Sequence, residues 1–313
     1  MSRYTLLRIA AWQLAALFLT TDAALHAAEP LVPGTGKLVA KAFDDFEDPA
    51  WKYKFNWPKS SDNLDSNVRT PAGASINGRW FESALRGQPD VIERVATPEG
   101  GISGSTGSLL LRSLNTGVPK RPSREGQQDD LIINARGALG GAISVSRAPS
   151  AVVRVFLPPF EEWENRTGNS FGFRASVEAP KKASGWRRGS QMETYWPGIF
   201  IYFESETDRR FEKDSAKFLL RAGPKGHDFP GPEITETGWW TLGMSFTHDG
   251  QVHYYVRQGV EDLTAEDHVG SQFPYGFRAQ RFKTFFFNVA NFDDGKSWST
   301  PWVIDDPALY LAR

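Results

Sequence analysis

The chain has 313 residues, of which 36 are basic and 37 acidic, and it contains no cysteine. The nearly balanced charge excludes the strong electrostatic attraction on which nucleic-acid binding depends, so we expect no nucleic-acid partner. The absence of cysteine excludes a fold that is held together by disulfides, so a large core, a bound metal ion or both must supply the stability.

The first 28 residues have the pattern of a secretory signal peptide. Arg3 and Arg8 are followed by an apolar stretch over 9–19 that is too short to span a bilayer, and Ala27 and Ala28 supply small residues near a cleavage point. We expect cleavage after Ala28, a secreted or periplasmic protein, and no membrane insertion. Residues 29–313 contain no clear linker or internal repeat, which favours a single domain.

After the signal peptide, strand patterns bounded by Gly, Pro, Asn and Asp recur and helical periodicity is almost absent. The expected strands are 37–46, 90–96, 108–114, 131–134, 142–146, 151–157, 171–177, 198–204, 217–222, 239–247, 251–257, 282–289 and 302–311. Residues 56–87 and 117–130 read as loops, and 260–267 reads as the one helical turn. This spacing is typical of an all-β, two-sheet antiparallel sandwich with very little helix.

The clearest element is a hairpin over 239–257. Asp249 and Gly250 suit the positive φ angles that a tight hairpin turn requires. Strand alternation predicts that Leu242, Met244 and Phe246 share one face.

Several segments resemble known β-sandwich families. The hairpin region 238–256 is similar to the hairpin of laminin-G-like and concanavalin A-like jelly rolls, and 196–203 resembles a buried central strand of the same sandwich. Residues 43–48 and 302–311 resemble the first and last strands of carbohydrate-binding-module jelly rolls. The resemblance implies a jelly roll whose terminal strands lie side by side. Such folds include lectins, glycoside hydrolases and polysaccharide lyases, so the fold alone does not select a function.

The same resemblance implies a structural calcium ion where the terminal strands meet. Related jelly rolls often hold Ca²⁺ there, which would place Asp45, Glu47 and Asp305 among the ligands. Calcium binds several carboxylate and carbonyl oxygens at once. The alternative is a rim of solvated carboxylates.

Tryptophan side chains indicate where a sugar would bind, because an indole offers a large apolar face with a polar edge. Six of them lie in or beside predicted loops: Trp57, Trp80, Trp186, Trp196, Trp298 and Trp302. We expect at least one to line a ligand cleft, although any single one is equally explained as a core or anchoring residue.

Two weak patterns offer catalytic candidates. If the strand over 198–204 continued, Glu204, Glu206 and Asp208 would share one face, as the paired carboxylates of a retaining glycosidase require. The order of these acids differs from the glucanase pattern, and an exposed strand end explains them equally well. The segment Gln251-Val-His253 resembles the Gln-x-His strand of alginate lyases, but the companion strands of those enzymes are not visible.

The sequence therefore predicts a secreted, lectin-like protein that binds polysaccharide or glycan without catalysis. A glycoside hydrolase or polysaccharide lyase of the same fold is the alternative, and a structural or adhesive surface protein is a third possibility. Paired carboxylates in an open groove would favour an enzyme, whereas a groove lined by aromatic side chains would favour a binder. The oligomeric state is not indicated.

Overall fold

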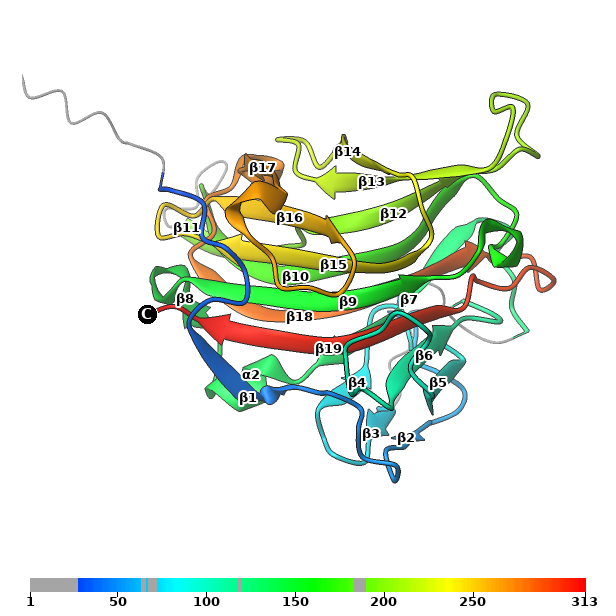
Figure 1. The fold of residues 1–313 in the computed structure, drawn as a ribbon. Coiled ribbons are helices and arrows are strands. Elements are labelled where there is room, and N and C mark those ends of the chain that lie inside the picture. The colour runs from blue at the N-terminus through cyan, green and yellow to red at the C-terminus, as the bar shows by residue number, and fades with distance from the viewer. Residues whose placement is uncertain (1–27, 63–65, 67–71, 117–119, 183–189) are drawn as a thin grey trace, which may run out of the picture.

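The computed structural model describes residues 28–62, 66, 72–116, 120–182 and 190–313. The predicted signal peptide therefore lies almost entirely outside the described residues, as does Trp186. Two antiparallel β-sheets pack face to face and form a jelly-roll β-sandwich (Figure 1). Within the described residues, no helix is long and apolar enough to cross a membrane.

Sheet A has eight strands, and the last strand of the chain lies near its middle. In spatial order its strands are β17 (His268–Gln272), β16 (Val252–Gln258), β15 (Gly238–Phe246), β9 (Pro149–Leu157), β19 (Trp302–Leu311), β6 (Ser108–Arg112) and β5 (Val91–Val95), with β1 (Lys37–Phe43) also paired to β19.

Sheet B has eleven strands, with β10 and β18 near its centre. In spatial order its strands are β14 (Asp228–Ile234), β13 (Ser215–Arg221), β12 (Gly198–Glu204), β10 (Gly168–Lys182), β18 (Arg281–Phe292), β7 (Gly126–Ile133), β4 (Trp80–Glu82), β3 (Ala74–Ser75) and β2 (Tyr53–Lys54), while β11 (Ser190–Tyr195) pairs with β10 and β8 (Ile143–Ser144) pairs with β18. The helical elements with defined bounds are α2 (Ala135–Leu139) and short 3-10 turns at Val145–Arg147, Phe160–Glu162, Ala265–Asp267 and Pro274–Gly276.

The predicted pairing of the terminal strands is confirmed, because β1 and β19 are antiparallel neighbours with Lys37 opposite Leu311. The predicted hairpin is confirmed as β15 and β16. The helical turn predicted over 260–267 is a 3-10 turn, and the sequence analysis missed α2. The loop predicted over 117–130 was wrong in its last part, since β7 begins at Gly126.

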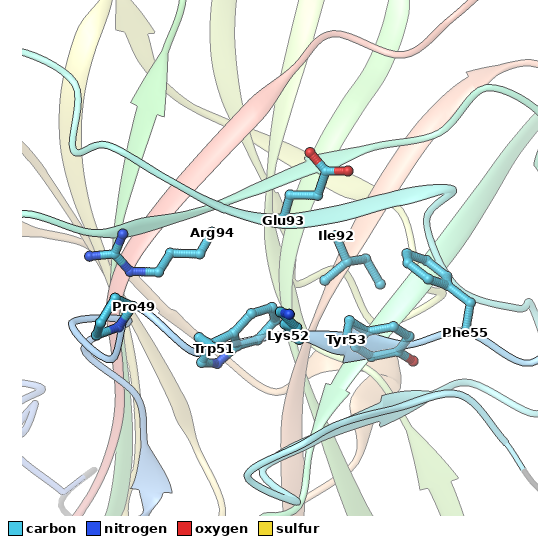
Figure 2. A pocket seen from close by; sticks show the side chains of 8 residues that line it. All are labelled: Pro49, Trp51, Lys52, Tyr53, Phe55, Ile92, Glu93 and Arg94. Atoms are coloured by element: carbon cyan, nitrogen blue, oxygen red, sulfur yellow. The ribbon is translucent and has the colours of Figure 1, made fainter.

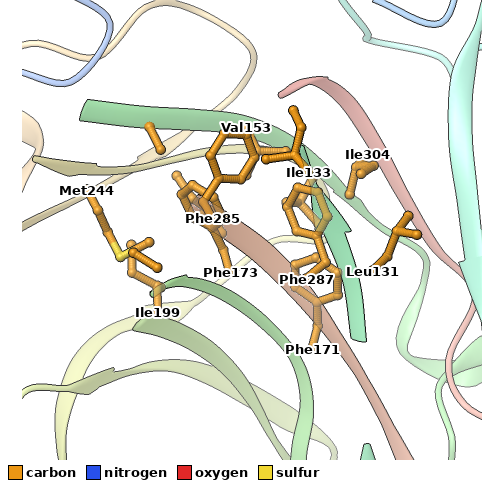
Figure 3. Packing of buried hydrophobic residues seen from close by; sticks show 14 of the residues in the cluster. Leu131, Ile133, Val153, Phe171, Phe173, Ile199, Met244, Phe285, Phe287 and Ile304 are labelled. Atoms are coloured by element: carbon orange, nitrogen blue, oxygen red, sulfur yellow. The ribbon is translucent and has the colours of Figure 1, made fainter. Parts of the chain in front are cut away.

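The core lies between the sheets and is filled by alternate residues of each central strand (Figure 3). Phe171 and Phe173 of β10 pack against Phe285 and Phe287 of β18, with ring centroids 5.7–5.8 Å apart. Because strand side chains alternate, the residues between these phenylalanines must face away from sheet A. The central strands of sheet B therefore project a second set of side chains outward.

The two outer faces differ in what covers them. On sheet A, Val152, Tyr255 and Leu263 form a second apolar cluster, which is covered by Val32 from the start of the described chain and by Tyr310. On sheet B, the outer face of the central strands lines hollows in the surface. The open face of the sandwich is thus that of sheet B.

Candidate functional site

The strand register of sheet B aligns two rows of outward-facing residues across neighbouring strands. The first row runs from β7 to β12 through Asp130, Asn288, Gly172 and Phe200. The second row runs from β7 to β14 through Ile132, Phe286, Arg174, Gly198, Arg221 and Asp228. Residues that are distant in the sequence are thereby brought to one patch of the sheet.

Two hollows lie over these rows and join into one groove, which we call the sheet B groove. One has a volume of 420 Å³ and the other 580 Å³, and both are lined by Leu85, Asp130, Trp196 and Phe286. The smaller hollow adds polar and charged groups from several strands, namely Arg86, Gln128, Asn169, Arg174, Arg221 and Tyr275. A groove that combines aromatic and polar groups has the composition expected of a ligand site.

Arg174 lies at the centre of the groove and is only 7% exposed. Its guanidinium carbon lies over the rings of Phe200 and Phe286, at 5.2 and 5.5 Å from their centroids. Its Nη2 donates to the backbone oxygen of Trp196 at 2.9 Å, and its Nη1 donates weakly to Asn288 at 3.4 Å. Its Nε is buried and has no hydrogen-bond partner. Among the described residues, no carboxylate forms an ion pair with Arg174.

Two glycines make room for this arrangement. A Cβ at residue 198 would lie 2.6 Å from Cγ of Arg174, and one at residue 172 would lie 2.9 Å from the ring of Phe200. Any larger residue would therefore displace the arginine or the ring beside it. The glycines allow Arg174 to lie along the sheet instead of extending into solvent.

Arg221 differs from Arg174 because its charge is already balanced. It forms a two-point ion pair with Asp228, at 2.5 and 3.1 Å, and its guanidinium stacks 4.8 Å from the centroid of Phe200. Tyr275 also hydrogen-bonds Arg221. Tyr275 has a φ of +61°, which a non-glycine residue rarely adopts. The backbone there holds the phenol at the rim of the groove.

Asp130 is the acidic group of the groove. Burial raises its pKa to about 6, although the charges of Arg86 and Arg174 act in the opposite direction. Asn288 donates to its Oδ1 at 2.5 Å, and Nε of Arg86 lies 4.0 Å from its Oδ2. A carboxyl group with a pKa near neutrality can exchange a proton with a ligand.

Of the tryptophans predicted to bind ligand, Trp196 lines both parts of the groove. Trp57 is 49% exposed and stacks on Phe55, with centroids 5.5 Å apart and planes 11° apart. Trp298 is 57% exposed and lies in a separate hollow of 380 Å³, where Arg112 is 5.0 Å from its ring. These three side chains do not lie together in one site.

The prediction for Trp80 and Trp302 was wrong, because both are fully buried in the core. Trp80 donates its indole N–H to Asp44 at 2.8 Å, and Trp302 packs edge-on against Trp163 at 4.9 Å. Neither ring can stack on a sugar from outside the protein. Trp186 lies outside the described residues.

A further hollow of 370 Å³ lies between β2 and β5, at the edges of the two sheets (Figure 2). Trp51, Tyr53 and Phe55 line one side of it, and Glu93 and Arg94 lie across from them. Arg94 donates from Nε to the backbone oxygen of Phe46 at 2.6 Å, so its guanidinium is hydrogen-bonded to the protein.

The predicted carboxylate face of Glu204, Glu206 and Asp208 does not form. Strand β12 ends at Glu204, and the chain then turns, with the N–H of Asp208 donating to the carbonyl of Ser205. Glu204 pairs with Lys217 and Asp208 pairs with Arg210 at 2.6 Å. Charge pairing at a strand end explains these acids, and none of them lines the sheet B groove.

His253 lies on sheet A and not on the groove face. It is fully buried, with Nε2 2.8 Å from Thr247 and Nδ1 2.6 Å from Ser271. Burial lowers its pKa to about 4, so the ring is neutral at physiological pH. His253 therefore cannot serve as a base in the groove on the opposite face of the sandwich.

The acidic residues near the terminal strands meet only in part. Ser105 Oγ lies 3.0 Å from Glu47 and 2.9 Å from Asp305, while Asp45 accepts from the backbone N–H of Glu47 at 3.3 Å. Both oxygens of Glu47 already accept hydrogen bonds from Thr106. Among the described residues, no group of three or more His, Cys, Asp or Glu is arranged to hold a metal ion. The calcium ion at Asp45, Glu47 and Asp305 therefore stays a prediction.

Comparison with known proteins finds structures that resemble this one, but it does not identify a family for the chain. No protein-family model matches the chain, and no curated protein matches it. Among solved structures, an alginate lyase from Pseudomonas aeruginosa is similar at 8% identity, with 72% of this chain and 87% of that chain covered and a TM-score of 0.36. An alginate lyase from Klebsiella pneumoniae is similar at 10% identity, with 88% and 96% covered and a TM-score of 0.35. The carbohydrate recognition domain of Emp47p is similar at 10% identity, with 74% and 97% covered and a TM-score of 0.34.

These structures share the β-sandwich architecture and include both binding domains and enzymes of carbohydrate chemistry. At this level of similarity they carry no argument for a particular activity. The description of the groove rests on the side chains of this chain alone.

Sequence reasoning missed Arg174, Asp130 and Tyr275. The strand predicted over 171–177 held a usable signal, because the inward alternation of its apolar residues leaves Arg174 on the opposite face. Asp130 was hidden because its segment reads as a charged loop. Tyr275 lies in a short 3-10 turn, and its position depends on tertiary contacts that no local pattern predicts.

Proposed function

We propose that this protein is a secreted, carbohydrate-binding β-sandwich that binds polysaccharide in the sheet B groove. The observation that carries the proposal is the groove itself, in which Trp196 offers aromatic surface beside hydrogen-bonding groups. Phe200 and Phe286 lie beneath, largely covered by the guanidinium groups that stack on them. Pyranose rings present apolar C–H faces and polar hydroxyl edges, so they match a surface of this mixed kind.

The polar groups of the groove are placed to bind hydroxyl groups. The side-chain Oδ1 of Asn169 is buried and has no hydrogen-bond partner, and Gln128 and Asp130 lie beside it along the same hollow. A buried polar atom without a partner costs stability, and a ligand hydroxyl that bonds to it removes that cost.

Replacing Trp196 by alanine is expected to weaken polysaccharide binding by about 10-fold, because an aromatic contact that is buried on binding contributes about 1–3 kcal/mol. The measurement is affinity electrophoresis or calorimetric titration over a panel of soluble polysaccharides. The matched control is Trp298→Ala, since Trp298 is exposed in a separate hollow. Full binding by Trp196→Ala and lost binding by Trp298→Ala would move the site away from sheet B.

Polysaccharide cleavage is a second candidate function, and the raised pKa of Asp130 is the observation that favours it. A carboxyl group that titrates near pH 6 beside a tyrosine and two arginines has the properties of a general acid or base. The release of reducing ends from the same polysaccharide panel distinguishes cleavage from binding. If the native protein cleaves a polysaccharide and Asp130→Asn does not, the protein is an enzyme. If no product forms from any polysaccharide, the proposal of binding without catalysis stands.

Asp305 is expected to make the protein less stable as the pH rises. Burial raises its pKa from 3.8 to about 7, so the folded state binds the proton more tightly than the unfolded state does. Its contribution to stability is therefore lost as the pH rises from about 4 to about 7. Asp305→Asn should raise the free energy of unfolding at pH 8 by on the order of 1–3 kcal/mol and flatten this pH dependence. If Asp305→Asn lost as much stability as the native protein when the pH rises from about 4 to about 7, this assignment would be contradicted.

The same variant tests the calcium ion that the sequence predicts. If Ca²⁺ binds Asp305, added Ca²⁺ raises the melting temperature of the native protein at pH 8 and a chelator reverses the rise, while Asp305→Asn does not respond. An unchanged melting temperature in the native protein would remove the calcium ion from the account.

A further inference from the structure

Arg174 is a buried cation that forms no direct ion pair with a carboxylate of the described chain, although the charge of Asp130 acts on it from farther away and opposes the lowering of its pKa by burial. It has 7% exposure, its Nε has no hydrogen-bond partner, and no described acid forms an ion pair with it. Its neighbours in the groove differ in this respect, because Arg221 is paired with Asp228, and Arg86 lies 4.0 Å from Asp130. A charge buried without a partner lowers the stability of the folded protein.

The surroundings of Arg174 keep this cation in place. Phe200 and Phe286 stack against the guanidinium, Gly198 leaves space for its aliphatic stem, and the backbone oxygen of Trp196 accepts from Nη2. These contacts hold the guanidinium in one orientation, and its Nε is buried without a hydrogen-bond partner. Burial lowers the pKa of Arg174 to about 10, which still leaves it charged at neutral pH.

We propose that Arg174 is the anchor for an oxyanion carried by the sugar, so that the sheet B groove selects acidic polysaccharides over neutral ones. The inference rests on the proposed function, since it names the class of glycan that the groove binds. A guanidinium binds carboxylate and sulfate oxygens through paired N–H groups, and such charge-assisted bonds are among the strongest hydrogen bonds in proteins. The ligand chemistry is therefore a uronate carboxylate or a sulfate ester on a pyranose.

The remaining groups of the groove fit a ligand of this kind. Trp196 lines the hollow beside Arg174 and offers apolar surface to the ring that carries the anion. Asn288 lies next to Arg174 and Asp130, and it links the two through its side-chain amide. Three arginines and Asp130 line the smaller hollow, and Asp228 balances one of these arginines, Arg221. One positive charge therefore remains even when Asp130 is ionised, which favours an anion.

The test compares two matched pairs of polymers with the native protein. Polygalacturonate and its methyl ester differ in the carboxylate, and dextran sulfate and dextran differ in the sulfate. We expect binding to at least one acidic member, and at least about 30-fold weaker binding to its neutral counterpart. The pair that shows the difference identifies the oxyanion as a carboxylate or a sulfate.

The variant Arg174→Met removes the charge and retains an unbranched chain between the two rings. We expect it to lose the preference for the acidic polymer, and we expect the melting temperature of the free protein to rise, because a buried charge without a direct ion-pair partner has been removed. Arg174→Lys keeps the charge without the fork of N–H groups and should recover part of the preference. The control Arg210→Gln removes an exposed arginine that is paired with Asp208 and should bind as the native protein does.

Equal binding of the acidic and neutral members of both pairs would overturn the inference and leave the proposed function intact. Failure to bind both acidic polymers would also overturn it. Failure to bind any polymer of the wider panel, acidic or neutral, would instead overturn the proposed function. A lower melting temperature in Arg174→Met with an unchanged acidic preference would show that Arg174 has a purely structural role.

Discussion

Replacing Lys59 by methionine is expected to lower the free energy of unfolding by about 3–5 kcal/mol, as removal of one partner from a buried ion pair does. Lys59 has no exposed surface, and its Nζ lies 2.6 Å from Asp129 and 3.3 Å from Asp90. Asp129 is itself fully buried, so the substitution removes a positive charge from beside a buried carboxylate that lies close to a second acid, Asp90. Chemical denaturation at neutral pH measures the effect.

Lys54→Met is the matched control, because Lys54 is an exposed lysine of strand β2, close to Lys59 in the sequence. Its replacement should change the free energy of unfolding by less than about 0.5 kcal/mol. The double variant Lys59→Met/Asp129→Asn should recover part of the loss in stability, since it also removes the negative charge of one of the two carboxylates that contact Lys59. A change below about 1 kcal/mol in Lys59→Met would contradict the role assigned to this lysine.

The position of Lys59 connects its stability effect to the groove. The next residue, Ser60, lines the larger hollow, and its backbone N–H donates to Glu82. Glu82 also accepts from the backbone N–H of Gly73 at 3.1 Å. Lys59 and Glu82 therefore stabilise the wall of the larger hollow at Ser60, and Lys59→Met should weaken polysaccharide binding as well.

Asp44→Ala is expected to cost a comparable amount, about 3–5 kcal/mol, because four side chains donate to this one carboxylate. The donors are the indole groups of Trp51 at 3.1 Å and Trp80 at 2.8 Å, Asn77 at 3.0 Å and Arg79 at 2.9 Å. Each buried donor that loses its acceptor costs about 1–3 kcal/mol. Thermal and chemical unfolding both report the loss.

Asp48→Ala provides the comparison for Asp44→Ala. Asp48 accepts only a local hydrogen bond, from the backbone N–H of Ala50 at 2.8 Å in an exposed turn, so its removal should have a small effect. Asp44→Asn should lie between the two, because an amide keeps one acceptor oxygen. Equal stability of the two alanine variants would show that the Asp44 network contributes little.

Periodicity and turn chemistry predicted much of the sandwich. The hairpin formed by β15 and β16 was readable because Asp249 and Gly250 mark its turn, and its inward residues Leu242, Met244 and Phe246 are fully buried as alternation requires. The short edge strands β2, β3 and β4 were missed. They contain two or three residues each, so they carry no period for a pattern to show.

The site was harder to predict than the fold. Trp80 lies in a polar segment that reads as a loop, yet Asp44 accepts a hydrogen bond from its indole and allows the ring to enter the core. Local sequence could not show this contact, which joins residues 36 positions apart. Of the predicted tryptophans, Trp196 does reach the groove. It was predictable because it lies just before a buried central strand.

The groove depends on register, and register is a tertiary property. Asp130, Asn288 and Arg174 come from three strands that are far apart in the sequence, and only the pairing of β7, β18 and β10 places them together. A lone arginine in a strand pattern is usually exposed or paired. The observation that distinguishes Arg174, its burial without a direct ion-pair partner, exists only in the folded protein.

The most direct test of the account is a crystal structure of the native protein with an oligosaccharide of the polysaccharide that it binds most tightly. The account predicts that the sugar lies along the sheet B groove, with a ring against Trp196 and an oxyanion on the guanidinium of Arg174. A sugar bound instead in the hollow of Trp298, or in the hollow between β2 and β5, with the groove empty, would contradict it.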